Sequence, residues 1–286
     1  MKITTAEESL LRSVSEALSG RVDISRKIGA GGFGEVYGGT WKNTEVAVKV
    51  VGPCASSDRI CWLRRAARLG NEIDLLARVR HSNIPPLYAS GQHAGYLYAI
   101  TPYRGHDFSK GIPGKLLSLH HILHVGVEIA DTLIYLHDQG IIHRDVKPGN
   151  VMINAEGRVS LIDFGTAREL EGPPENRLSG TPFFAAPEQC LGKREGTYTD
   201  SYSFGLMLYV LATNYAPYKV RNTDLYAMKC GPRISLSRFR PVQKDLATIV
   251  DASLDPEPSR RPSMRAIKEV LGMLQEDIKI SAPVGI

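Results

Sequence analysis

Cysteine is scarce in this sequence, and its spacing suits neither a metal site nor a disulfide framework. The four cysteines, Cys54, Cys61, Cys190 and Cys230, include no CxxC pair. A disulfide-stapled miniprotein and a zinc-ribbon fold are therefore excluded. Reduced thiols in a cytoplasmic protein are the expectation.

Long apolar runs and a strong charge of one sign are also lacking. The longest uncharged apolar run, 204–212, is far shorter than the roughly 20 residues that span a bilayer. Residues 1–20 carry acidic side chains where a signal peptide needs an apolar core, so the chain as given is expected to hold neither a leader nor a membrane span. The net charge of +5 is too dilute to predict nucleic-acid binding.

The remaining composition is ordinary for a globular protein. Hydrophobic residues make up 43% and charged residues 23% of 286 positions, which suits one large domain or two modest ones. Residues 3–19 predict a short amphipathic helix, because leucine and valine recur there at helical spacing before Gly20. We therefore expect an N-terminal helical extension at 1–20 that docks on the neighbouring domain.

Two lobes of different character are expected to follow this extension. Residues 21–103 alternate apolar and polar side chains as strands do, with one helical pattern at 61–79. Residues 104–286 are mostly helical, and the helix predicted at 203–211 is apolar nearly all round, so we expect it to be buried. The pattern predicts an α+β fold whose two lobes meet near 101–105, where ligands tend to bind.

A glycine-rich segment stands between two predicted strands. Residues 29–36 read GAGGFGEV, which has the spacing GxGxxGxV. A strand follows, whereas the turn of a dinucleotide-binding fold would open a helix, so a dinucleotide site is disfavoured. A glycine hairpin can cover phosphates with backbone N–H groups that no side chain obstructs. Taken alone, the segment also fits a flexible hairpin tip.

Lys49 ends the predicted strand Val46–Lys49, and Glu72 lies on the helix predicted next. A lysine at a strand end is usually solvated. Here Glu72 is a candidate ion-pair partner, which would hold the ammonium against a triphosphate.

The segment His143–Asn150, HRDVKPGN, is the most specific pattern in the chain. It is predicted to form a loop after a long helix, in which Asp145 can accept a hydroxyl proton. Lys147 can neutralise a transferring phosphoryl group, and Asn150 can bind a metal. Further along, Asp163–Gly165 follows an apolar strand, and a carboxylate in that position suits a divalent cation that bridges phosphates.

With these four motifs in this order, the chain resembles the eukaryotic-type Ser/Thr protein kinase family over residues 22–275, with the short loops of a bacterial member. Two later motifs agree. Ala186–Glu188 is similar to the APE that closes the family's activation segment, and Asp200–Gly205 is similar to its DxWxxG element, with Tyr202 in place of tryptophan. Arg261 resembles the arginine that pairs with the APE glutamate. The resemblance implies a bilobal protein kinase fold.

The resemblance implies a site for ATP with Mg²⁺, or with Mn²⁺ in its place. Lys49, fixed by Glu72, is expected to contact the α- and β-phosphates. Asn150 and Asp163 are expected to bind the metal. The residues expected to contact ATP are Ile28, Gly29, Ala30, Gly31, Gly32, Phe33, Gly34, Val36, Ala47, Lys49, Thr101, Tyr103 and Asp107.

The resemblance also implies the reaction. Asp145 is expected to orient and deprotonate the acceptor hydroxyl. Lys147 and Thr181 are typical of Ser/Thr enzymes, in which this threonine bonds the catalytic aspartate and lysine. Gly149 replaces an acidic residue that binds substrate arginine in some relatives, so no preference for basic motifs is expected. The predicted activity is transfer of the γ-phosphoryl of ATP to Ser or Thr of proteins, including autophosphorylation.

Two alternatives stay open at this point. A pseudokinase scaffold would bind ATP without transfer, although such proteins have usually lost one of Lys49, Glu72, Asp145, Asn150 and Asp163, all present here. A small-molecule or lipid kinase of similar fold generally lacks the peptide-binding segment. Proteins with Ser or Thr are the expected partners, and nucleic acid is not one. A regulator at the N-terminal helix or at the basic stretch 59–68 is a further candidate partner.

Regulation is where the sequence departs from the family's pattern. In this family the arginine at the position of Arg144 usually pairs with a phosphorylated residue of the activation segment. The position of that phosphorylated residue is occupied here by Arg177, which cannot be phosphorylated on oxygen. Glu175 can supply a permanent negative charge, and Ser179 and Thr166 are candidate phosphosites. We therefore predict activity without phosphorylation of the activation segment.

Overall fold

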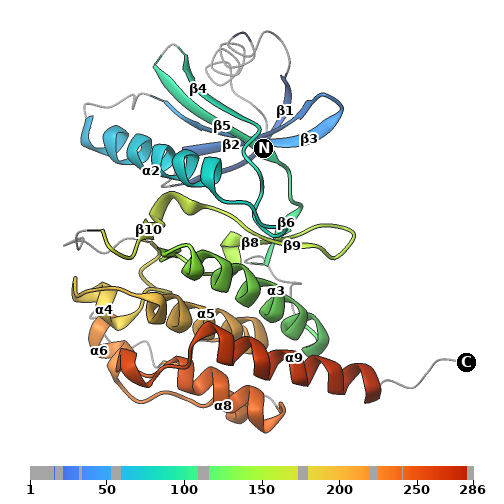
Figure 1. Ribbon diagram of the computed structural model, residues 1–286, viewed down its shortest axis with the longest axis vertical. Helices are drawn as coiled ribbons and strands as arrows, with labels where there is room; N and C mark the ends of the chain where they lie inside the picture. Colours follow the sequence, from blue (N-terminus) through green and yellow to red (C-terminus); the bar gives the residue numbers. More distant parts are fainter. Residues whose placement is uncertain are drawn as a thin grey trace, which may run out of the picture. The chain divides into compact units, whose positions relative to one another are not determined.

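The computed structural model describes most of the chain, namely residues 16, 22–31, 34–52, 59–93, 95–108, 116–172, 180–218, 225–239 and 241–281. The helix predicted at 3–19 lies outside these residues except for Glu16, so it stays a prediction, as do the expected lobe boundaries. The described residues form two compact units (Figure 1). The first runs to Arg104 and includes Asp163–Gly165, and the second holds Gly105–Ile162 and the residues from Thr166 onward.

The first unit is built on a five-stranded antiparallel sheet. Its strands, in the spatial order β1-β2-β3-β5-β4, are β1 (Val22–Gly31), β2 (Gly34–Trp41), β3 (Thr44–Val51), β5 (Tyr96–Pro102) and β4 (Ala89–His93). A two-residue turn joins β2 to β3, and α2 (Arg59–Arg78) lies between β3 and β4 in the chain.

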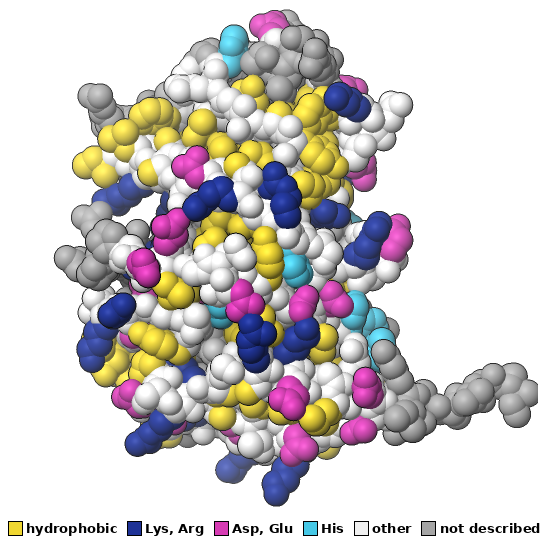
Figure 2. Space-filling view, viewed as in Figure 1, with side chains coloured by type: hydrophobic (Ala, Val, Ile, Leu, Met, Phe, Trp, Pro, Cys, Tyr) yellow, Lys and Arg dark blue, Asp and Glu magenta, His cyan; other side chains and the backbone are white. Residues whose placement is uncertain are grey.

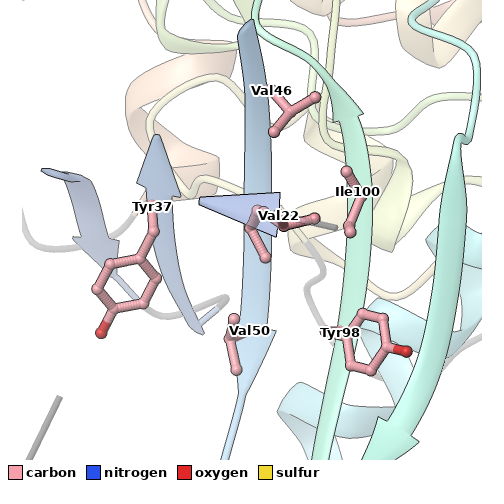
Figure 3. Packing of buried hydrophobic residues seen from close by; sticks show 7 residues of the cluster. Val22, Tyr37, Val46, Val50, Tyr98 and Ile100 are labelled. Atoms are coloured by element: carbon pink, nitrogen blue, oxygen red, sulfur yellow. The ribbon is translucent and has the colours of Figure 1, made fainter. Parts of the chain in front are cut away.

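One face of this sheet buries the main apolar cluster of the unit, shown in Figure 3. Val46, Val48 and Val50 share this face, because successive side chains of a strand point to opposite sides. Each such buried valine contributes roughly 1.5–3 kcal/mol relative to an exposed one. The cluster is completed from the neighbouring strands by Val22, Tyr37, Tyr98 and Ile100.

The opposite face of the sheet packs against α2. Val51 and Ala99 contact Leu69 of this helix, with Trp62 and Ile73 packed beside them. The alternation that buries the valines of β3 therefore turns the intervening side chains of the strand toward α2. Lys49 is one of these, so its side chain faces the helix that carries Glu72.

The second unit is mainly helical. Its helices are α3 (Leu119–Asp138), α4 (Pro187–Cys190), α5 (Thr197–Thr213), α6 (Leu225–Cys230), α7 (Leu236–Phe239), α8 (Lys244–Ser253) and α9 (Met264–Ser281). Ser118 caps α3, because its side-chain oxygen accepts the backbone N–H of His121. The apolar stripe predicted along this helix is buried, and α3 packs against α5 and α9.

Helix α5 is longer than the helix predicted at 203–211. It begins at Thr197 and ends at Thr213, where Asn214 adopts a left-handed conformation with φ +60°. Nearly all of its side chains are buried, as its apolar composition predicts. The sequence missed the first turns because they carry Thr, Tyr, Asp and Ser, whose polar groups are buried through tertiary contacts.

Short strands in the second unit fix the loop between them. β6 (His106–Asp107), β8 (Val151–Ile153) and β9 (Val159–Leu161) form a small sheet, and β7 (Ile141–Ile142) pairs with β10 (Arg168–Glu169). The segment from His143 to Lys147 connects β7 to the 3-10 helix η2 (Pro148–Asn150), which leads directly into β8. The HRDVKPGN motif is thus anchored to a strand at each end.

The predicted α+β class is confirmed, with a strand-rich first unit and a helical second unit. The helix predicted at 61–79 is α2. The chain continues from β9 through the 3-10 helix η3 (Phe164–Thr166), and the 3-10 helix η4 (Pro258–Arg260) precedes α9. Within the described residues, no helix combines the length and the apolar character needed to cross a membrane.

Candidate active site

In the first unit, Lys49 lies between two carboxylates. Its Nζ is 2.5 Å from Glu72 Oε2 and 2.9 Å from Asp163 Oδ1. All three side chains are largely buried. The predicted Lys49–Glu72 ion pair is thereby confirmed, and Asp163 joins it.

Each member of this group is held by its own element. Lys49 extends from β3, and Glu72 extends from the face of α2 that packs on the sheet. Asp163 has a left-handed backbone with φ +65°, a conformation that a non-glycine residue keeps only where its surroundings enforce it. The amide nitrogen of Asn71 on α2 supplies such a contact, because it donates to the carbonyl oxygens of Phe164 and Gly165.

The electrostatics of this group favour a charged lysine. Burial opposes the charge of the ammonium, but the carboxylates of Glu72 and Asp163 more than offset that and raise the pKa of Lys49. Burial also raises the pKa of Glu72, against the opposing effect of the ammonium. The two carboxylates hold the ammonium of Lys49 in place, and this ammonium can still contact an anionic ligand.

The glycine hairpin joins β1 to β2, and the two strands stay paired as far as Gly31 opposite Gly34. Gly34 has φ +114°, and a Cβ there would lie 2.6 Å from the carbonyl oxygen of Val50. Only glycine fits that position. Gly32 and Phe33 lie outside the described residues, so their predicted contact with phosphates stays a prediction.

Several residues predicted to contact ATP share one face of the sheet. Ala47 pairs with Thr101 across β3 and β5, and Val36 pairs with Lys49 across β2 and β3. Directly paired residues point to the same side of a sheet, which here is the side opposite the valine cluster. Ile28 covers Gly38, the β2 partner of Ala47, and a Cβ on Gly38 would lie 3.2 Å from its Cδ1.

Two other predicted ATP contacts are placed differently. The backbone N–H of Tyr103 donates to the carbonyl oxygen of Glu45 at 3.0 Å, so that donor is already occupied. Asp107 lies on β6 in the second unit, paired with Met152 of β8. Its predicted contact with ATP stays a prediction.

In the second unit, two side chains and one backbone N–H group donate hydrogen bonds to the carboxylate of Asp145. Oδ2 accepts from Lys147 Nζ at 2.6 Å and from Asn150 Nδ2 at 3.2 Å, and Oδ1 accepts from the Thr181 backbone N–H at 2.8 Å. Lys147 Nζ also donates to Thr181 Oγ1 at 2.5 Å. The contact of Thr181 with the predicted catalytic aspartate and lysine is thereby confirmed.

The backbone before Asp145 is held from within α5. The carboxylate of Asp200 accepts the backbone N–H groups of His143 and Arg144 at 2.9 and 2.8 Å, and it also meets His137 Nε2 at 2.8 Å. Burial works against its charge, but the hydrogen bond and charge of His137, together with His143, hold the pKa of Asp200 below its usual value. Asp200 therefore serves as an ionised anchor for the loop.

Gly180 brings the activation segment close to the same loop. Its φ is +90°, and a Cβ there would lie 2.8 Å from the carbonyl oxygen of Arg144. The absence of a side chain therefore lets Thr181 reach Asp145. Glu175, Arg177 and Ser179 lie outside the described residues.

Arg144 has a buried partner that the sequence analysis missed. Its guanidinium donates to Glu195, from Nε to Oε2 at 2.6 Å and from Nη2 to Oε1 at 2.9 Å. Thr166, named above as a candidate phosphosite, is buried, and its hydroxyl donates to the carbonyl oxygen of His143. Glu195 stands in an irregular stretch before α5, where no local pattern marks it.

The predicted pair of Glu188 and Arg261 is confirmed as a buried, two-pronged ion pair, which is called a fork below. Arg261 Nη1 and Nη2 lie 2.8 Å from Glu188 Oε1 and Oε2, and the Thr199 hydroxyl also donates to Oε1 at 2.9 Å. The guanidinium stacks over the ring of Tyr202, 4.9 Å from its centroid. This fork ties α4 to α5 and to the segment before α9.

The two predicted metal ligands each fit an oxygen-binding cation within their own unit. The amide nitrogen of Asn150 donates to the carbonyl oxygen and carboxylate of Asp145, which leaves the amide oxygen as the atom that can bind a metal. Asp163 contributes a carboxylate. Among the described residues no cluster of three or more His, Cys, Asp or Glu could hold a metal. Each residue offers an oxygen of the kind that Mg²⁺ prefers, and their shared role as metal ligands stays a prediction.

A buried lysine supports the backbone that follows Thr181. Lys229 of α6 is fully buried, and its Nζ donates to the carbonyl oxygen of Phe183 at 2.7 Å. The ammonium lies 5.3 and 5.6 Å from the ring centroids of Tyr202 and Tyr218. Burial lowers the pKa of Lys229 to about 8, and the nearby Cys190 and Glu188 only partly oppose this.

This pKa predicts a pH dependence of stability. Between about pH 8 and the ordinary lysine value of 10.5, the unfolded chain binds more protons than the folded one, so the free energy of unfolding rises with pH. The wild type should gain on the order of 3 kcal/mol over this window relative to Lys229→Met. Urea unfolding of both proteins from pH 7 to 10.5 measures the difference. Lys244→Met, an exposed lysine of α8, is the control, and a constant difference between wild type and Lys229→Met would contradict the prediction.

Residues 22–271 match the protein kinase domain family. The chain is 28% identical to Mitogen-activated protein kinase kinase kinase 10 of Xenopus laevis, over 92% of this chain and 27% of that protein. It is 28% identical to Proto-oncogene serine/threonine-protein kinase mos of Sus scrofa, over 90% of this chain and 82% of that protein. Serine/threonine-protein kinase Nek5 of Mus musculus is 31% identical, over 84% of this chain and 38% of that protein. The chain thus spans only about a quarter to two fifths of two of these relatives.

Proposed function

This chain belongs to the protein kinase family, and from that premise we propose that it transfers the γ-phosphoryl group of ATP to serine or threonine hydroxyls of proteins. The relatives named above that carry the words serine/threonine-protein kinase support this class of acceptor. The observation that carries the proposal is the fixed carboxylate of Asp145, with Lys147 and Thr181 bonded around it.

In the proposed reaction the acceptor hydroxyl attacks the γ-phosphorus. A new O–P bond forms, the bond to the leaving oxygen of ADP breaks, and the hydroxyl proton passes to the carboxylate of Asp145. Lys147, beside this carboxylate, offsets the negative charge of the phosphoryl group in transit. Thr181 holds both side chains, so a serine or threonine hydroxyl meets a preformed pair.

The proposed nucleotide contacts are those that the family's motifs imply. Lys49, charged and fixed by Glu72, binds the α- and β-phosphates, and the backbone of the glycine hairpin covers them. Asn150 and Asp163 are the proposed ligands of Mg²⁺, which neutralises phosphate charge when bound. Mn²⁺ is an alternative, because it accepts the same oxygen ligands.

The test is transfer of ³²P from [γ-³²P]ATP with Mg²⁺, to the protein itself and to a generic basic protein. Phosphoamino-acid analysis should find the label on serine and threonine. Label that persists after the protein is replaced by an Asp145→Asn variant would contradict the assignment of Asp145. Absence of label from a protein that still binds ATP would favour the pseudokinase alternative.

The proposed activity does not require a phosphate on the activation segment. Arg144, the residue that such a phosphate would meet, is already paired with a carboxylate, and Thr166 is buried. Phosphatase-treated wild type and the Ser179→Ala variant should therefore keep their rate within about twofold of untreated protein. Thr166→Val, which keeps the volume of the buried side chain, completes the set. An inactive dephosphorylated protein, restored by autophosphorylation, would contradict the prediction.

Protein substrates are the proposed partners, and a cytoplasmic location is proposed from the composition. On the face of the helical unit seen in Figure 2, Lys and Arg side chains are interspersed with Asp and Glu. The expectation of no nucleic-acid partner stays a proposal. A regulator at the basic stretch 59–68 stays a proposal. Arg64 is exposed on this stretch beside Ile60 and Leu63, which are also exposed.

A further inference from the structure

We propose that Glu195 is a positioning residue for phosphoryl transfer: its carboxylate holds Arg144, and through Arg144 it fixes the backbone that carries Asp145. The inference rests on the proposed function, because it concerns the same reaction. It adds a residue that neither the motifs nor the family resemblance single out.

The backbone at Arg144 needs external support. Its φ is +70°, a left-handed value that is uncommon for residues other than glycine and persists only where contacts enforce it. Asp200 holds the N–H groups of His143 and Arg144 on one side. Those two bonds fix the peptides before Asp145 but leave the long side chain of Arg144 to be anchored elsewhere.

Glu195 supplies that anchor. The two hydrogen bonds from Nε and Nη2 of Arg144 form a parallel fork with both carboxylate oxygens, the geometry in which this pair is strongest. The side chains are 2% and 3% exposed, so water does not compete for either charge. The segments of these two residues are far apart in sequence, and the fork joins the loop of Asp145 to the stretch that leads into α5.

The same guanidinium also reaches the start of the activation segment. Its Nη1 donates to the carbonyl oxygen of Thr166 at 3.2 Å, and the Thr166 hydroxyl returns a bond to the carbonyl oxygen of His143. From the other side, Gln189 Nε2 donates to the carbonyl oxygen of Arg144 at 3.2 Å. Arg144 is therefore the point where three segments converge, and Glu195 neutralises its charge there.

None of these contacts touches the carboxylate of Asp145 itself. Its orientation depends on the peptide that Arg144 shares with it, because Oδ1 must meet the Thr181 N–H while Oδ2 meets Lys147. A displacement of about 1 Å at a reacting group can lower the rate about 100-fold. Loss of the Glu195 anchor should therefore slow the chemical step rather than weaken nucleotide binding, whose proposed phosphate contact is Lys49.

The first variant is Glu195→Gln, which keeps the shape but replaces one acceptor oxygen by a donor and removes the charge. We expect kcat to fall about 30- to 100-fold while KM for ATP stays within about twofold. Glu195→Asp keeps the charge and should retain more activity than Glu195→Gln. Glu156→Gln is the matched control, because Glu156 pairs with Arg158 on the surface and should leave kcat unchanged.

A second readout does not depend on transfer. In Glu195→Gln, the amide protons of His143 and Arg144 should exchange with solvent about tenfold faster than in the wild type, whereas those of α9 should not change. This separates the two proposals. A wild type without transfer contradicts the proposed function, and unchanged exchange at these amides contradicts the role of Glu195. A folded Glu195→Gln protein with kcat within about twofold of wild type also overturns it.

If Glu195→Gln does not fold, the double variant Arg144→Met with Glu195→Leu removes both charges and leaves no unpaired ion. We expect it to fold and to stay slow. Wild-type kcat in this double variant would overturn the proposal. Failure of both proteins to fold would assign the pair to stability alone, which overturns it as well.

Discussion

Asp145→Asn is expected to reduce phosphoryl transfer about 10²- to 10⁴-fold, with nucleotide binding retained. The amide cannot take the hydroxyl proton. It also turns a donor toward Lys147 or Thr181, both of which donate to the wild-type carboxylate at 2.6 and 2.8 Å. The measurement is initial-rate ³²P transfer together with ATP titration by a fluorescent analogue.

The control for Asp145→Asn is Asp245→Asn, the same chemical change at an exposed position of α8. It should leave the rate unchanged. Transfer by Asp145→Asn at a rate near that of wild type would contradict the role of this carboxylate as the base. A loss of ATP binding in the same variant would mean that the change acts on the fold or the nucleotide site instead.

Arg261→Ala is expected to lower the free energy of unfolding by about 3–5 kcal/mol, the largest stability effect predicted here. The substitution leaves the carboxylate of Glu188 buried. Of the hydrogen bonds to this carboxylate given above, only the one from the Thr199 hydroxyl is then left. It also removes the guanidinium from the ring of Tyr202 and from the carbonyl oxygens of Tyr198 and Asp255. Urea unfolding followed by circular dichroism measures the change.

Arg265→Ala is a matched control four residues away. Arg265 Nη2 lies 2.7 Å from both carboxylate oxygens of Asp138, but the two side chains are 67% and 52% exposed. Its loss should change the free energy of unfolding by less than about 1 kcal/mol, because water and salt screen an exposed pair. If Arg261→Ala and Arg265→Ala lowered the free energy of unfolding equally, burial would not determine how much the Arg261–Glu188 pair contributes to stability.

A further variant separates an orphaned charge from a lost attraction. Glu188→Leu combined with Arg261→Met removes both ions and keeps comparable volume. It should be more stable than Arg261→Ala alone, because no carboxylate then stays buried without its partner. A double variant as unstable as the single one would indicate that packing around Tyr202, rather than the charges, supports this region.

The arrangement around Lys49 was largely predictable from sequence, because its residues sit in regular elements. Alternation along 45–50 already separates Lys49 from the buried valines, and helical spacing places Glu72 one element further on. The sheet register then brings Ala47, Thr101 and Val36 to the same face. What alternation could not reveal is that the N–H of Tyr103 is taken by Glu45, since that contact depends on where the chain leaves β5.

Around Asp145, the sequence indicated the neighbouring polar residues but not the contacts that hold their backbone. HRDVKPGN identifies Asp145, Lys147 and Asn150, and the resemblance adds Thr181. The anchor of the same loop, Asp200, was noted only as part of a motif, and its two backbone hydrogen bonds cross 56 and 57 positions of sequence. Glu195 and Lys229 were missed altogether.

The sequence by itself determined the class of fold, the order of the motifs and the chemistry-bearing side chains, because these depend on periodicity and on residue type at short spacing. The tertiary structure decided which charges are buried and which of them meet partners that no motif indicates: Arg144 pairs with Glu195, and Lys229 donates to the carbonyl oxygen of Phe183. The physical reason is that a residue pattern along the chain reflects contacts between residues that are close in sequence, within one or two turns of a helix. Burial instead depends on elements that meet across dozens of residues, and it is burial that raises or lowers a pKa and gives an ion pair its effect on stability.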